Sequence, residues 1–108
     1  LNGAAEMSVQ RAYERLATKL ANAGRLYLKL QRPGPARIYF RRVLDEYPGT
    51  TAVADAELGL ALADVADGKR DEAMAALREL TSRHAGRPEG ARAARELARL
   101  ERQARKKQ

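Results

Sequence analysis

The chain has no cysteine and no tryptophan, and its 108 residues include one phenylalanine, one histidine and two serines, Ser8 and Ser82. Without cysteine there is no disulfide framework, no zinc–thiolate site and no thiol nucleophile. The same absence leaves the compartment open, because such a chain suits oxidising and reducing spaces alike. With so few nucleophiles and general bases, catalysis has little to draw on. We therefore expect no enzymatic activity, no cofactor and no metal site.

Long apolar runs are also missing. No stretch approaches the roughly 20 apolar residues that a membrane-spanning helix needs, and the first residues do not form a signal-peptide pattern. Because the sequence begins with Leu1 rather than methionine, we expect a processed product or an excised part of a longer protein. The length fits a single domain, residues 1–108.

Helix-forming residues dominate the composition. Alanine, leucine and arginine supply 52 residues, against nine for valine, isoleucine and threonine together, which predicts an all-α chain. Half of the hydrophobic content is alanine and only 5% of the residues are aromatic. The core must therefore be thin, which favours stacked helix pairs over a deep globule with a pocket.

Prolines and glycines divide the chain into five helical stretches. The breaks fall at residues 32–35, 47–50, 68 and 84–88, and Gly68 is expected to supply a left-handed stop. The first stretch, about residues 5–30, carries apolar residues at alternating steps of four and three, which form the first-helix seam: Val9, Tyr13, Leu16, Leu20, Ala23, Tyr27 and Leu30. Two interpretations are open, since this seam could pack within the chain or oligomerise with another chain as a structural helical module.

A shift of 37 residues aligns the chain with itself. It places Ala36 on Ala73, Phe40 on Leu77, and Ala54 on Ala91, so the repeating unit is a helix pair. The unit that starts at Ala17 resembles the tetratricopeptide repeat, a pattern of about 34 residues. Six residues carry the resemblance: Gly24, Tyr27, Leu30, Ala36, Phe40 and Pro48. Gly24 and Ala36 are expected to let the two helices approach, with Tyr27 and Phe40 filling the space beside them.

A second unit, residues 54–87, keeps Gly68 and Ala73 but has Asp64, Leu77 and Ala85 where the pattern has two aromatics and proline. The resemblance implies an all-α, right-handed solenoid of about five helices in antiparallel pairs. Its parts would be a first repeat at 17–50 whose first helix extends back to about residue 5, this degenerate second repeat, and a capping helix at 88–107.

The segment from Tyr39 to Thr50, followed by alanines at 52, 54 and 56, carries a narrower resemblance. It is similar to the repeats of bacterial cell-envelope tetratricopeptide proteins, namely the lipoprotein of the outer-membrane barrel-assembly machine and the Tol-associated periplasmic coordinator. Residues 26–30 and 36–39 extend the likeness to the barrel-assembly lipoprotein, although its lipidated cysteine is missing. The resemblance implies a scaffold in the periplasm or at the inner face of the outer membrane, near the membrane through a missing lipid anchor. The cytoplasm is the other location left open.

Charge is distributed unevenly along the chain. The net charge is +7, with +4 in residues 1–32, −4 in 50–68 and +5 in 87–108. In the resembled repeat the first helix of each pair lines a concave groove, so these segments would face it in the order basic, acidic, basic. The middle positions would be Asp55, Leu58, Leu62, Val65 and Ala66. The resemblance assigns these residues to partner binding: Arg25, Lys29, Arg92, Arg95, Arg99 and Arg102.

The arginines of the last stretch have two interpretations. They could be the solvated face of a capping helix, or a surface for an acidic protein segment or anionic lipid head groups. Nucleic acid ranks last, because Glu96 and Glu101 interrupt the stripe and no aromatic side chain offers a stacking platform. His84 is expected to be a half-packed residue at a helix end. The leading hypothesis is a non-enzymatic scaffold that binds protein partners within a multi-protein complex.

Overall fold

The computed structural model describes residues 3–107. Within that range it contains five helices, α1 (Gly3–Lys29), α2 (Pro33–Glu46), α3 (Ala52–Ala66), α4 (Arg70–Arg83) and α5 (Pro88–Lys106), and no strand. The all-α expectation is confirmed, and the breaks between helices lie at or beside the prolines and glycines that the sequence singled out.

Local backbone chemistry explains the turns. Pro33 and Pro88 begin α2 and α5, where a missing N–H leaves no helical hydrogen bond unmade. Gly68 follows α3 with φ +78°, the left-handed stop expected from the sequence. Gln31 takes the same role after α1 with φ 61°, a conformation that few residues other than glycine adopt.

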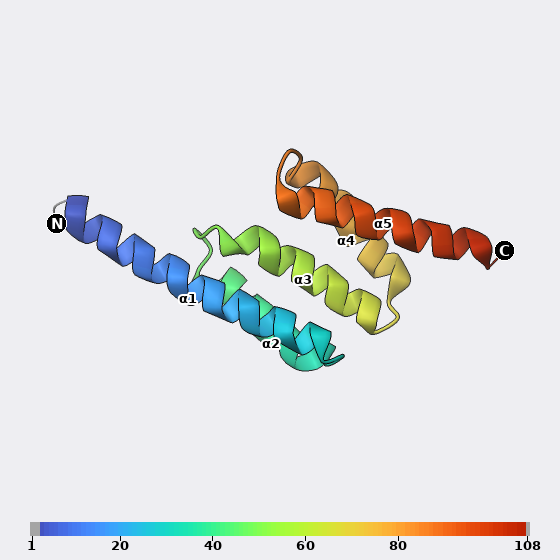
Figure 1. The fold of residues 1–108 in the computed structure, drawn as a ribbon, viewed down its shortest axis with the longest axis horizontal. Coiled ribbons are helices and arrows are strands. Elements are labelled where there is room, and N and C mark those ends of the chain that lie inside the picture. Colours follow the sequence, from blue (N-terminus) through green and yellow to red (C-terminus); the bar gives the residue numbers. More distant parts are fainter. Residues whose placement is uncertain (1–2, 108) are drawn as a thin grey trace.

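The helices form one stack of pairs. Figure 1 shows α1, α3 and α5 side by side, with α2 and α4 behind them. Helix α2 packs against both α1 and α3, and α4 packs against both α3 and α5. The molecule measures 61 × 29 × 17 Å, so it is only about two helices thick. This arrangement is that of a helical solenoid.

Phe40 is the centre of the first core cluster. It is fully buried among alanines of α1, α2 and α3. A Cβ added at Gly24 of α1 would lie 2.6 Å from the Phe40 ring, and one added at Gly59 of α3 would lie closer still. The Phe40 ring thus fills the space beside Gly24, as the sequence predicts, and Ala36 is fully buried in the same cluster.

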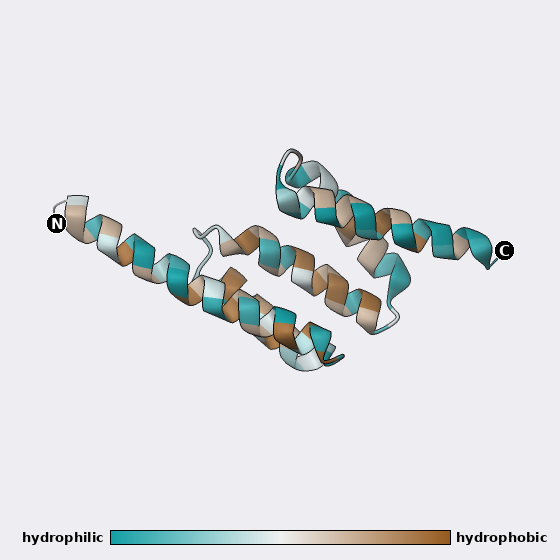
Figure 2. Ribbon diagram, in the orientation of Figure 1, coloured by the Kyte–Doolittle hydropathy of each residue, from teal (hydrophilic) through white to brown (hydrophobic). Residues whose placement is uncertain are grey.

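The second core cluster joins α3, α4 and α5. Its buried members are Leu58, Ala61, Leu77, Leu80, Ala93 and Leu100. Figure 2 shows broad hydrophobic sections on α3, which has neighbours on both sides, whereas α5 is mostly hydrophilic. Helix α5 thus buries one apolar stripe, and most of its other residues are exposed or partly exposed.

The first-helix seam divides into two parts. Leu20 and Tyr27 pack against the core, but Val9, Tyr13 and Leu16 are 62%, 44% and 46% exposed, on a half of α1 that projects beyond the stack (Figure 1). Leu30 lies past the end of α1 and is 56% exposed. A continuous seam within the chain is therefore wrong, since α2 and α3 are too short to cover a 27-residue helix.

Candidate protein-binding groove

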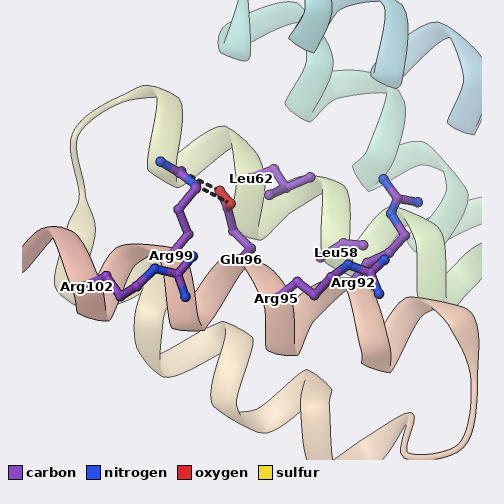
Figure 3. Close-up of a pocket in the computed structure, with 7 residues that line it drawn as sticks. All are labelled: Leu58, Leu62, Arg92, Arg95, Glu96, Arg99 and Arg102. Carbon is purple, nitrogen blue, oxygen red and sulfur yellow. Dashed lines mark hydrogen bonds and ion pairs between the residues drawn. The ribbon is translucent and has the colours of Figure 1, made fainter.

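A groove of about 330 Å³ runs between α3 and α5, called here the α3–α5 groove. Its floor is apolar, because Leu58 and Leu62 lie one turn apart on α3. Its wall is α5, where arginines recur at steps of three and four along one helix face. Figure 3 draws the lining residues: Leu58, Leu62, Arg92, Arg95, Glu96, Arg99 and Arg102.

The groove is open because α5 rests mainly on α4. Helix α1 lies against α3 along a shared interface, whereas α3 and α5 touch at few positions. The side of Leu58 that faces α4 is covered, which leaves this leucine 2% exposed, while Leu62 is only partly buried. Val65 was grouped with them from the sequence, but it lines a separate hollow beside Leu100.

Asp55 holds one of the arginines that line the groove. This carboxylate of α3 forms ion pairs with Arg25 of α1 and with Arg92 of α5, the latter at 3.4 Å. The Asp55 side chain is only 15% exposed. Burial lowers the pKa of the Arg25 guanidinium, and the nearby charge of Arg92 lowers it further. Two of the six arginines and lysines assigned to partner binding are thus engaged with the chain's own acid.

Arg99 is engaged as well. Its Nε and Nη2 atoms donate to the two carboxylate oxygens of Glu96 at 2.7 and 2.6 Å, one turn earlier on α5. The hydrogen bond to Glu96 raises the pKa of Arg99 above its usual value. This bidentate pair fixes the guanidinium in the groove wall.

Arg95 and Arg102 differ from Arg92 and Arg99 in having no ion pair within residues 3–107. Both are exposed, and both line the groove. Lys29 also has no ion pair in that range, but it lies at the end of α1 and does not line this groove. The structure therefore brings four of the six predicted residues to one groove and leaves two of these four with free charge.

The acidic charge of α3 and its following turn is largely neutralised inside the chain. Arg37 of α2 pairs with Asp64 at 3.0 Å and Asp67 at 2.5 Å, and these hydrogen bonds raise the pKa of Arg37. Glu57 pairs with Arg83 and with His84, whose Nε2 lies 2.9 Å from Glu57 Oε1. The acids of α3 and its following turn are thus paired with arginines or His84, and none of them is among the residues that line the groove.

His84 caps the C-terminal end of α4 and is 9% exposed, so it is more buried than expected for a helix-end residue. Its bond to Glu57 fixes the α3–α4 packing. In the part of the chain that the structure describes, no three residues among histidine, cysteine, aspartate and glutamate gather as a metal site would require.

Gly59 is the main residue that sequence reasoning missed. Glycine in the middle of a helix costs about 1 kcal/mol relative to alanine, so its presence within α3 is a signal of close packing. The internal repeat of 37 residues does not reveal Gly59, because the equivalent positions in the other helices are Asn22 and Glu96.

Stacked antiparallel helix pairs with a groove along one side define a helical-repeat scaffold. A profile of the tetratricopeptide repeat family matches residues 20–50 and 55–87, more than half of the chain, so the chain belongs to this family. Such repeats generally mediate protein–protein interaction. Comparison with curated proteins and with solved structures gives no significant match. Among the described residues, no helix is both long enough and apolar enough to cross a membrane.

Proposed function

We propose that the chain is a scaffold that binds an acidic, amphipathic segment of a partner protein in the α3–α5 groove. The observation that carries the proposal is the combination of an apolar floor, Leu58 and Leu62, with two groove arginines, Arg95 and Arg102, that pair with no carboxylate among residues 3–107. Apolar side chains of the segment would pack on the partly exposed Leu62, and its carboxylates would pair with the arginines.

The dimensions suit a short segment. From Arg92 to Arg102 the groove wall spans ten residues of helix, about 15 Å. That length matches about three turns of a bound helix or about five residues of extended chain. Because Arg92 and Arg99 are already paired, the carboxylates of the segment should align with Arg95 and Arg102, which lie two turns apart on α5.

The test is a binding titration with a defined probe. The probe is a synthetic peptide of about 15 residues with glutamates and a leucine at every third or fourth position, and a lysine version with the same leucines is the control peptide. Arg95→Glu/Arg102→Glu should weaken binding of the glutamate peptide at least tenfold. The matched control is Arg32→Glu/Arg41→Glu, which changes net charge equally at two exposed arginines outside the groove.

Equal weakening by both double variants would mean that only overall charge matters, and it would contradict the groove proposal. Equal affinity for the glutamate and lysine peptides would contradict the acidic partner. Circular dichroism of each variant verifies that helix content is unchanged.

We also propose that the scaffold belongs to a bacterial cell-envelope assembly, in the periplasm or at the inner face of the outer membrane. The support is the resemblance of residues 39–50 and the alanines that follow to envelope repeat proteins. Fractionation of cells that express the full-length gene product tests it. Recovery with the envelope fractions is expected, and recovery in the cytoplasm would contradict the assignment.

A further inference from the structure

The projecting half of α1, from Gly3 to Leu16, is about 20 Å long. It carries three apolar residues of the first-helix seam, Val9, Tyr13 and Leu16, that are exposed by 62%, 44% and 46%. Its ties to the rest of the fold lie at its base, where Tyr13 packs edge-on against Tyr47 at 4.9 Å and Glu14 accepts hydrogen bonds from Thr51. Helices in proteins are stabilised mainly by packing of their apolar face. In this half of the 27-residue α1 that face is largely exposed, so it is a candidate surface for a partner.

Local charge indicates which partner. Residues 3–16 contain Glu6, Arg11, Glu14 and Arg15 and sum to zero, whereas residues 17–108 carry the whole net charge of +7. Two copies of this chain would repel each other through most of their surface. The projecting half of α1 is the segment through which they can meet without that repulsion.

The seam is also complementary to itself. Its steps from Val9 to Tyr13, Leu16 and Leu20 are four, three and four residues, and this order reads the same in both directions. An antiparallel second copy therefore presents the same spacing. In that register Tyr13 faces Leu16 of the second copy, as an isologous interface requires. Val9 lies beside the second copy's Leu20, which is partly buried against its own core.

We propose that the chain forms an antiparallel homodimer through the first-helix seam. Two short helices bury less than the roughly 800 Å² per partner of a standard interface, so the dimer is weak, with a dissociation constant in the micromolar range or above. The interface is separate from the α3–α5 groove, and each proposal stands or falls by its own test.

Sedimentation velocity from about 10 µM to about 1 mM tests the dimer. The 11.9 kDa chain should shift from monomer to dimer as concentration rises. Val9→Asp/Leu16→Asp should raise the dissociation constant at least tenfold. The matched control Leu26→Asp/Ile38→Asp changes two exposed apolar residues outside the seam, 54% and 63% exposed, and should dimerise as the wild type does. A wild-type monomer at all concentrations, or equal effects of the two variants, would overturn the proposal.

Cross-linking tests the orientation, because the chain has no cysteine of its own. In the antiparallel register the two copies of residue 16 are offset by three residues, about 4.5 Å along the axis, and the two copies of residue 9 by eleven, about 16 Å. A short bismaleimide should link Leu16→Cys chains and leave Val9→Cys chains unlinked. Equal linking of both would exclude the antiparallel register.

Discussion

Phe40 is the chain's one phenylalanine, and it lies between two glycines of different helices. Gly24 lies on its own pair's first helix and Gly59 on the next pair's first helix. One ring thereby joins the two repeats, and the absence of side chains on both glycines lets α1 and α3 close around it. In a core made mostly of alanine, Phe40 is the largest fully buried side chain among the described residues.

Gly59→Ala is expected to destabilise the fold by about 1–3 kcal/mol, because the new Cβ would overlap the Phe40 ring and overpacking outweighs the better helix propensity of alanine. Urea unfolding followed by circular dichroism measures the loss. Gly49→Ala is the control, since a Cβ at Gly49 meets nothing within 4 Å.

A double variant tests whether the Phe40 ring is what the new Cβ of Gly59→Ala meets. Phe40→Leu removes ring atoms, so Gly59→Ala should cost less in that background than in the wild type. Equal costs of Gly59→Ala in both backgrounds would show that the ring is not the obstacle.

At the scale of elements, α5 differs from α3 on one helix face. The residues of that face are apolar in α3 and basic in α5. Shifted by 37 residues, Leu58 and Val65 of α3 correspond to Arg95 and Arg102 of α5. Residue 58 is buried, whereas residues 95 and 102 are exposed. The polar replacement supports the proposal that residues 88–107 form a capping helix, and it also creates the basic wall of the groove.

Gly68→Ala is expected to destabilise the second helix pair by about 1–2 kcal/mol, since an alanine pays that cost at φ +78°. Thermal unfolding measures it. Gly34→Ala is the control, because Gly34 is exposed, has no positive φ and meets nothing that a Cβ would touch. A loss as large at Gly34 would remove the backbone explanation.

The helices could be predicted because proline and glycine break them through local chemistry, at Pro33, Pro88 and Gly68 for example. How much of the first-helix seam is buried could not be predicted. Periodicity shows which residues share a helix face, but it does not show how far a neighbouring helix extends along that face. The groove residues were named from the resemblance. That Asp55 pairs with both Arg25 and Arg92 depends on the spacing of three helices, which no local pattern encodes.

At the scale of the whole molecule, ion pairs between helices neutralise the acidic segment of a chain whose net charge is +7. The carboxylates of residues 50–68 are held by arginines or His84 from α1, α2, α4 and α5. This network joins the helices. It involves Arg92 of the groove wall and leaves Arg95 and Arg102 beside the partly buried Leu62 without an ion pair within residues 3–107.

Asp55→Ala is expected to have opposite effects on stability and binding. It leaves Arg25 and Arg92 without their carboxylate and should cost about 1–2 kcal/mol of stability. The freed Arg92 should strengthen binding of the glutamate peptide several-fold, with a steeper decrease in affinity as salt rises. Chemical unfolding and peptide titration at two salt concentrations measure the two effects, and weaker binding would place the site away from Arg92.

The central claim is that an acidic segment lies on Leu58 and Leu62 beside Arg95 and Arg102, and its most direct test is an NMR titration of ¹⁵N-labelled protein with the glutamate peptide. Amide shifts are expected to concentrate at residues 58–62 of α3 and 92–102 of α5, with α2 unchanged. Shifts that follow exposed basic residues wherever they lie, Arg32 and Arg41 included, or no shifts in the α3–α5 groove, would contradict it.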